Sequence, residues 1–399
     1  MAYLELPRPV HTALDILLPP IIRVFVLPPT TIYHTLRYLL YEPPFPGCTF
    51  RHYIAINRRR VFYGWLGWAR LPAGDVEYDI IPPSSEKYLK TCRVTRVECS
   101  PYEEDEYSPW VLRQGREEVT TRAVPGFWIE RIGETDEDLD RPARPEERLV
   151  FFIIGGGYVG GHPLRIHTAW SIAELTDVRV FCVNYRKSLS ADSAFPASLL
   201  DCLAGLQYVV QERGFEAKNI MLCGDSAGAN ASLALARCLG EMESAGGRRF
   251  GQVGSMCLHS PWSDMTSSFP SVRANRYTDH LVDLTTVNIP SHTRHFPNNK
   301  SNLYFSPALT TSGGFGYLVS HQTKVYISAG TAEAFYDEIL ALHHAMKRDG
   351  VDVQLRTLDG ATHSDFVWLD RNEIDSMGWT WTILRKDFED FWKRVTRGM

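Results

Sequence analysis

A serine flanked by glycines, in the stretch GDSAG at residues 224–228, is the first group in the chain whose setting could support chemistry. The stretch follows an apolar run that predicts a buried strand and precedes an alanine-rich run that predicts a helix. The two glycines permit a tight turn that would expose Ser226 at the helix N-terminus, where backbone N–H groups stabilise negative charge. Serine is also a preferred helix cap, so the pentapeptide alone leaves a nucleophile and a capping residue open.

A serine nucleophile requires a base and a group that orients the base. His363 lies in the loop after the last predicted strand, 351–358, and Glu333 lies in the loop after the strand predicted at 324–330. The order serine, acid, histidine along the chain is that of a catalytic triad on a parallel sheet. Asp337, one helical turn beyond Glu333, is a reserve candidate for the acid, with support of the loop or helix terminus as its alternative role.

A glycine-rich loop, IIGGGYVGG, follows the apolar run at 148–154. After such a strand, consecutive glycines can expose backbone N–H groups to the oxyanion that forms when a serine attacks a carbonyl. Gly155, Gly157 and Gly160 also fit a dinucleotide-binding fingerprint. No clear helix with a ribose-binding acid follows them, so we disfavour a cofactor site.

The elements that must position these groups alternate between buried strands and helices from about residue 145 onwards. This alternation predicts an α/β fold with a mostly parallel central sheet and helices on both faces. Strands are expected at 148–154, 178–185, 219–224, 251–260, 324–330 and 351–358, and helices at 198–211, after Ser226 and at 379–395.

We therefore divide the chain into an N-terminal lid with an irregular extension at 1–144 and a catalytic core at 145–399. Within the core, segment 263–320 lacks the strand–helix alternation and is rich in Ser, Pro, Asn and Asp. We expect it to be a lid insertion over the strand ends that shapes the substrate pocket. The acidic runs between residues 71 and 147 are expected to be solvated loops.

Composition restricts the partners and cofactors. The net charge is −5 and the one basic run, 58–60, is short, which argues against a nucleic-acid partner. The eight cysteines have neither paired spacing nor a nearby histidine cluster, so we expect no metal. Several lie in apolar runs, which favours a reducing, intracellular and cytoplasmic location. The oligomeric state stays open.

The apolar segment 14–41 raises the question of a membrane. Arg23 and two Pro-Pro pairs interrupt it, whereas a spanning helix needs about 20 mostly apolar residues. We expect short segments that form a lid packed on the core, with attachment to a membrane surface as the alternative. The chain begins without a basic stretch leading into an apolar core, so no secretory signal is expected.

Taken together, these motifs resemble the hormone-sensitive-lipase-like branch of the α/β-hydrolases. The matching stretches are the glycines at 155–157, the elbow at 224–228, the acid loop at 333–337 and the loop of His363. The stretch VNYRKSLSADSAFPASLLD also resembles a loop and helix of that branch. The resemblance runs from about residue 145 to the end and implies an α/β-hydrolase fold.

The resemblance implies a serine hydrolase that cleaves carboxylic esters without a metal or an organic cofactor. Ser226 would attack the acyl carbonyl, His363 would move the proton, and the backbone N–H groups of Gly156, Gly157 and Ala227 would bind the oxyanion. Water would then release the acyl group from the enzyme. We expect a small to medium, fairly hydrophobic acyl ester as the substrate.

Two positions depart from the family pattern and keep alternatives open. Ile154 stands where the family has a histidine before the glycines, and Glu333 stands where it usually has aspartate. One alternative is a non-hydrolytic catalyst of cyclisation or condensation in secondary metabolism, which Ile154 and the unusual N-terminal segment favour. The other is a catalytically silent ligand-binding protein, against which the presence of His363 argues.

Overall fold

A computed structural model gives the structure of the protein. It describes residues 17–45, 48–68, 81–82, 85–133, 138–247, 250–281, 288–368 and 374–396.

One eight-stranded sheet forms the centre of the molecule, in the spatial order β1-β2-β4-β3-β5-β6-β7-β8. Strands β3 to β8 pair in parallel, whereas β2 pairs in antiparallel fashion with β1 on one side and with β4 on the other. Strands β3 and β4 are continuous apolar runs and β6 is apolar between Ser255 and His259, because both faces of these strands are buried. The bounds are β1 Cys92–Cys99, β2 Val124–Arg131, β3 Leu149–Ile153, β4 Val180–Val183, β5 Ile220–Asp225, β6 Ser255–His259, β7 Lys324–Gly330 and β8 Asp352–Leu358.

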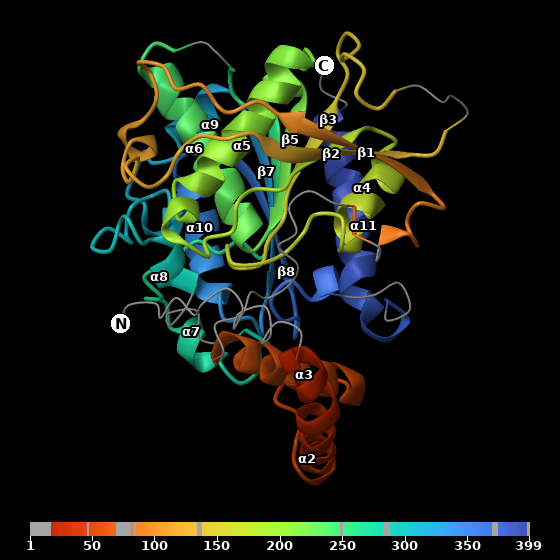
Figure 1. Ribbon diagram of the computed structural model, residues 1–399. Coiled ribbons are helices and arrows are strands. Elements are labelled where there is room, and N and C mark those ends of the chain that lie inside the picture. Colours follow the sequence, from red (N-terminus) through yellow and green to blue (C-terminus); the bar gives the residue numbers. More distant parts are fainter. Residues whose placement is uncertain are drawn as a thin grey trace.

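Helices cover both faces of this sheet (Figure 1). Helices α4 and α11 contact each other, and α5 packs against α6. The main helices are α4 His167–Thr176, α5 Ala197–Gln207, α6 Ala227–Ser244, α10 Tyr336–Arg348 and α11 Ile374–Thr396. This arrangement confirms the predicted α/β-hydrolase fold class with a mostly parallel sheet.

Strands β1 and β2 differ from the expectation of an irregular extension before residue 145. They extend the sheet beyond β4, so the sheet begins at Cys92. In β1 only the two terminal cysteines are buried, and polar residues separate Val94 from Val97 between them, so the strand lacks the apolar run by which the central strands are recognised. One acidic stretch lies between β1 and β2 and the other follows β2, and both are loops where the structure describes them.

The segment 263–320 has little regular structure, in agreement with its composition. Its described part holds α7 Ser271–Ala274, α8 Asn288–His292 and α9 Gly316–Ser320, joined by turns. Asn288 Nδ2 donates to the Gly157 carbonyl, and Ser271 Oγ donates to the Ala334 carbonyl. The insertion therefore lies against the loops that follow β3 and β7, at the carboxyl ends of these strands.

Residues 17–68 form an N-terminal hairpin, described apart from residues 46–47, that projects from the sheet-containing body (Figure 1). Its first arm is π-helical η1 Ile22–Val26 followed by α2 Leu27–Leu40, and its second arm is α3 Phe50–Trp68. His34 Nδ1 lies 3.2 Å from Tyr53 Oη and Tyr38 Oη donates to the Cys48 carbonyl, so the two arms run antiparallel.

The first arm of the hairpin is one continuous helical run, and the expectation of short, broken segments is wrong here. The second Pro-Pro pair occupies the first turn of α2, where the missing N–H groups would have no helical partner in any case. The π-helical turn before it lets the Leu27 N–H donate to the Ile22 carbonyl. No helix in the described parts of the chain is both long and apolar enough to cross a bilayer.

Candidate active site

Ser226 lies at the turn between β5 and α6. Its backbone has φ +52° and ψ −119°, a conformation that is costly for a residue with a Cβ. The two glycines explain how the turn closes: a Cβ on Gly224 would lie 2.6 Å from the Gly228 carbonyl, and one on Gly228 would lie 2.1 Å from the Ile153 carbonyl. The Ser226 hydroxyl makes no capping hydrogen bond to α6, so helix capping does not account for this serine.

The glycine loop after β3 packs directly on this elbow. The Gly155 N–H donates to Asp225 Oδ1, and Gly156 has φ +102°, which favours glycine. Within the described residues, the N–H groups of Gly156, Gly157 and Ala227 donate to no protein acceptor. The three donors that the resemblance assigns to an oxyanion hole are thus available at one end of the sheet.

Ile154 is buried in the core, and other contacts hold the loop where the family has a histidine. Tyr185 Oη donates to the Ile154 carbonyl at 2.9 Å, and Asn288 Nδ2 donates to the Gly157 carbonyl at 3.0 Å. Together with the hydrogen bond to Asp225, these contacts anchor the loop from three sides, and none of them needs a side-chain donor at position 154.

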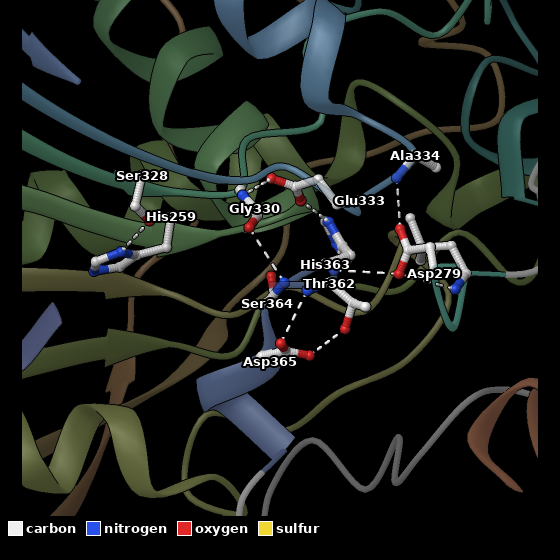
Figure 2. A network of polar contacts seen from close by, with 12 residues as sticks. His259, Asp279, Ser328, Gly330, Glu333, Ala334, Thr362, His363, Ser364 and Asp365 are labelled. Carbon is white, nitrogen blue, oxygen red and sulfur yellow. Dashed lines mark hydrogen bonds and ion pairs between the residues drawn. The ribbon is translucent and has the colours of Figure 1, made fainter. Parts of the chain in front are cut away.

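The predicted acid and base meet at the ends of β7 and β8 (Figure 2). Glu333 Oε2 lies 3.0 Å from His363 Nδ1, and Glu333 Oε1 accepts the Gly330 N–H at 2.6 Å. Both side chains are buried. Burial lowers the pKa of His363, but the hydrogen bond and charge of Glu333 and the charges of Asp279 and Asp225 outweigh it, so that the pKa lies above its ordinary value.

Asp337, the reserve acid, points to a different partner. Its Oδ2 accepts the Ser271 N–H at 2.8 Å, and its own N–H donates to Ser271 Oγ at 3.0 Å. These contacts hold the insertion against the first turn of α10, which corresponds to the supporting role considered as its alternative.

The end of β6 brings the serine turn and the histidine loop together. The Ser226 N–H donates to the His259 carbonyl at 2.9 Å, and the Ser364 N–H donates to Ser260 Oγ at 3.2 Å. No hydrogen bond joins Ser226 Oγ to His363 among the described residues. Such bonds are often long before a substrate binds.

Asp279, in the insertion, belongs to this site although no sequence motif pointed to it. It accepts the backbone N–H groups of His363 at 3.2 Å, Ala334 at 2.7 Å and His280 at 2.6 Å (Figure 2). Burial raises its pKa to about 6, and the charge of His363 and these hydrogen bonds act in the opposite direction. Asp279 therefore joins the insertion, the acid loop and the histidine loop.

A second carboxylate joins the histidine loop to the N-terminal hairpin. Asp365 Oδ2 accepts the Thr362 N–H at 2.9 Å and lies 3.3 Å from Nε2 of His52 in α3. Both His52 and Asp365 are buried. The hairpin thus contacts the loop that carries His363, which the sequence did not indicate.

The described residues contain one group with metal-ligand chemistry, formed by Cys223, Cys257 and His259 within the sheet. His259 Nδ1 lies 2.9 Å from Ser328 Oγ, and its Nε2 lies 3.4 Å from Cys257 Sγ. Burial lowers the pKa of His259 to about 4 and raises the pKa of Cys257 well above its usual value. Since metal ligation requires a thiolate, these groups fit a neutral hydrogen-bonded core cluster better than a metal site.

Comparison with known proteins agrees with this geometry. Residues 150–367, more than half of the chain, match the family model described as alpha/beta hydrolase fold. The chain belongs to this family. An acetyl-hydrolase of Streptomyces hygroscopicus is 25% identical over 58% of this chain and 72% of its own length. An ethyl acetate hydrolase of Pseudomonas putida is 27% identical over 57% and 70%, respectively.

Solved structures share the fold of this α/β-hydrolase. An esterase from the bacterial hormone-sensitive lipase family has a TM-score of 0.53 at 20% identity, covering 90% of this chain and 97% of its own. Carboxyl esterase 2 of the mycorrhizal fungus Tuber melanosporum has a TM-score of 0.58 at 14% identity, covering 76% and 88%. The protein is thus carboxylesterase-like in sequence and fold, and it resembles the hormone-sensitive-lipase branch.

Proposed function

We propose that this α/β-hydrolase cleaves carboxylic esters through an acyl-enzyme on Ser226. The observation that carries the proposal is the buried pair of Glu333 and His363, 3.0 Å apart, at the same sheet end as a strained serine whose hydroxyl caps no helix. Burial strengthens the interaction of such a pair, because little water screens it.

In the proposed reaction, His363 accepts the proton of Ser226 Oγ as the oxygen bonds to the acyl carbon. The carbonyl oxygen becomes an oxyanion that accepts hydrogen bonds from the N–H groups of Gly156, Gly157 and Ala227. Each such donor contributes roughly 10²- to 10³-fold in rate. The bond to the alcohol oxygen then breaks as His363 returns the proton to it, and water, deprotonated by His363, releases the acid from Ser226.

The proposed substrate is an ester with a small to medium, fairly hydrophobic acyl group. Two of the curated relatives are named for acetyl and ethyl acetate hydrolysis, which supports a short acyl group. In this proposal residues 145–399, together with β1 and β2, form the catalytic core. Segment 263–320 and the N-terminal segment then act as lids that shape the pocket.

Labelling with a fluorophosphonate, which modifies activated serines, tests the role of Ser226. We expect peptide mapping to find the label on Ser226, and the Ser226→Ala variant to lose turnover of phenyl acetate by at least about 10³-fold. Ser244→Ala, at an exposed position on the same helix, is the matched control. Turnover by Ser226→Ala at the wild-type rate would rule out the acyl-enzyme.

A second candidate function is non-hydrolytic cyclisation or condensation at the same groups, and Ile154 is the observation that favours it. The glycine loop is anchored by Asp225, Tyr185 and Asn288 without the family histidine, so its donors could serve a different reaction. Labelling of Ser226 without hydrolysis of any simple ester would favour this candidate. Absence of both labelling and turnover would favour ligand binding.

We further propose that the outer face of the hairpin rests on a membrane surface. Phe25, Leu39 and Leu40 are each more than 70% exposed, and Val24, Ile32 and Leu36 are more than half exposed. Residues 17–65 contain six arginines and one glutamate, a charge of +5 within a chain of −5. Apolar side chains beside basic ones suit the interface of an anionic bilayer, whereas two positive hairpins would repel each other.

Sedimentation with lipid vesicles tests the membrane proposal. We expect binding to phosphatidylcholine vesicles that contain phosphatidylserine, and loss of binding in a Phe25→Ser/Leu39→Ser/Leu40→Ser variant. Val319→Ser, an exposed apolar position on α9, is the control. Equal binding by the triple variant would contradict the proposal. We also propose an intracellular location, which the absence of disulfides among the eight buried cysteines supports.

A further inference from the structure

A cleft of about 890 Å³ separates the N-terminal hairpin from the insertion. Its walls come from α2 and α3 on one side and from residues 267–281 on the other, and its inner end is formed by Ala334 and Phe335. These two residues directly follow Glu333. The cleft therefore leads from the surface to the acid loop of the candidate active site.

Positive charge dominates the cleft. Arg37, Arg60, Arg273 and Arg276 line it, and among the described residues of its walls Glu42 is the one carboxylate. None of these four arginines forms an ion pair within the part of the chain that the structure describes. Several buried or half-buried arginines elsewhere in the described residues do have carboxylate partners, as Arg186 has Asp201 at 2.7 Å and Arg179 has Glu147 at 3.0 Å. The four guanidinium groups of the cleft are left without such partners.

Arg60 is the most informative of the four because it is only partly exposed. One guanidinium nitrogen donates to the Tyr277 carbonyl at 2.8 Å, and the group lies 5.4 Å from the centre of the Tyr277 ring. Arg276 lies 4.6 Å from the same ring. Burial lowers the pKa of Arg60 and the charge of Asp279 opposes this shift. A half-buried cation without a carboxylate contact costs free energy that an anionic ligand would offset.

Phe335 connects the cleft to the catalytic groups. Its ring centre lies 4.9 Å from that of His363 in an edge-to-face contact, and it stacks on Trp262 at 5.8 Å. The cleft also presents the rings of Tyr33 and Tyr53 beside its charged groups. Phe335 thus lies between the cleft and His363, and the cleft walls suit a molecule with an apolar or aromatic body and an anionic end.

We propose that this cleft binds the anionic group of the ester substrate, a carboxylate or a phosphate, on the portion that projects from the reacting carbonyl towards solvent. The inference rests on the proposed esterase function and specifies its substrate class as amphiphilic, anionic esters. Arginine suits this role because its planar guanidinium can donate two parallel hydrogen bonds to either oxyacid. The cleft side of α2, with His34, Arg37 and Tyr38, is distinct from the exposed apolar positions assigned to the membrane.

Three acetate esters with the same acyl group test this proposal: phenyl acetate, 4-acetoxybenzoate and 4-acetoxyphenyl phosphate. After correction for their rates with hydroxide, we expect kcat/KM to be at least about tenfold higher for one of the anionic esters than for phenyl acetate. Whichever anionic ester has the higher kcat/KM relative to phenyl acetate shows whether the cleft binds a carboxylate or a phosphate. The preference falls as salt is added, because the arginines are partly exposed to solvent.

Substitution of the arginines tests whether the anionic group of the substrate binds in this cleft. We expect Arg60→Gln and Arg273→Gln each to lower the anionic-to-neutral ratio of kcat/KM, by about tenfold for the half-buried Arg60 and by a smaller factor for the exposed Arg273. Arg58→Gln, an exposed arginine of α3 outside the cleft, should keep the wild-type ratio. If Arg60→Gln fails to fold, Arg273→Gln still tests the location. Arg273 is exposed on α7, so its substitution should leave the fold intact.

Several results would overturn the proposal. One is an anionic-to-neutral ratio of kcat/KM near unity in the wild type. Another is a ratio that stays at the wild-type value in both Arg60→Gln and Arg273→Gln while Ser226→Ala is inactive. Loss of vesicle binding in the cleft variants with an unchanged ratio would instead assign the arginines to lipid. If Ser226→Ala keeps its turnover, the esterase proposal fails, and calorimetric binding of 4-hydroxybenzoate, weakened by Arg273→Gln, still tests the cleft.

Discussion

Replacement of Glu333 by glutamine removes one negative charge from the candidate triad and changes almost nothing in side-chain size. In the wild type, Glu333 Oε2 lies 3.0 Å from His363 Nδ1 and holds the proton on that nitrogen, which leaves Nε2 free to act as the base. A glutamine amide can present its NH₂ group to Nδ1 instead. That arrangement favours the wrong tautomer, with the proton on Nε2, and it leaves the imidazolium formed during the reaction without a counter-charge.

The distance in the structure sets the size of the effect. Two unit charges 3.0 Å apart interact by about 5.5 kcal/mol at an effective dielectric constant of roughly 20. Each 1.36 kcal/mol of lost transition-state stabilisation costs about tenfold in rate. We therefore expect Glu333→Gln to lower kcat for phenyl acetate by about 10⁴-fold, with a much smaller change in KM.

The matched control is Asp337→Asn, which removes the other acid of the same loop region. Asp337 contacts Ser271 and not His363, so we expect it to cost less than about tenfold in kcat. Initial rates with phenyl acetate, together with thermal unfolding of both variants, provide the measurement. A loss larger in Asp337→Asn than in Glu333→Gln, with both proteins folded, would refute the assignment of the acid.

Three further predictions follow from contacts at the same sheet end. The pKa of His363 is raised and the base must be neutral, so kcat/KM should fall as the pH drops through a value above 6.5; Glu333→Gln should move this limb to lower pH, and an unmoved limb would contradict the pairing. Gly228→Ala places a Cβ 2.1 Å from a β3 carbonyl and should cost about 3 kcal/mol in urea unfolding, whereas Gly316→Ala, with open space around it, should change stability by less than about 0.5 kcal/mol. Asp279→Asn removes an acceptor from buried N–H groups, so the free energy of unfolding in urea should fall by about 1–3 kcal/mol. The variant should also lower kcat more than KM. A wild-type kcat would show that Asp279 does not position the histidine loop.

The central strands could be predicted because of how they are buried. A strand covered on both faces is largely apolar: β3 and β4 are apolar throughout, and β5 and β6 are apolar except near their ends. Strand β1 was not predicted because it lies at the sheet edge, where arginine, threonine and glutamate interrupt the valines between its two buried ends. The Pro-Pro pair before Thr30 predicted a break that the π-helical turn avoids, since hydrogen bonding there is shifted by one residue.

In the candidate site, too, some residues could be predicted from local sequence motifs, whereas others depend on contacts between distant segments. Ser226 with its two glycines, the glycine loop and the histidine loop were identified in the sequence, since each is a local motif tied to the end of one strand. The sequence favours Glu333 as the acid but keeps Asp337 as a reserve candidate. Asp337 lies one helical turn beyond Glu333 and contacts Ser271. Because Ser271 belongs to the insertion, only the tertiary packing reveals this partner.

The sequence by itself determined the strand order along the chain, the turn that carries Ser226 and the chemical types available at the strand ends, because these depend on neighbouring residues. The tertiary structure alone decided that Asp279 joins three loops, that His52 contacts the histidine loop, and that four arginines from the hairpin and the insertion share one cleft. The hairpin arginines and His52 lie more than 200 residues before the insertion arginines and the histidine loop, and Asp279 lies 55 residues before Ala334 and 84 before His363. Their meeting depends on how the segments pack, which no local pattern records.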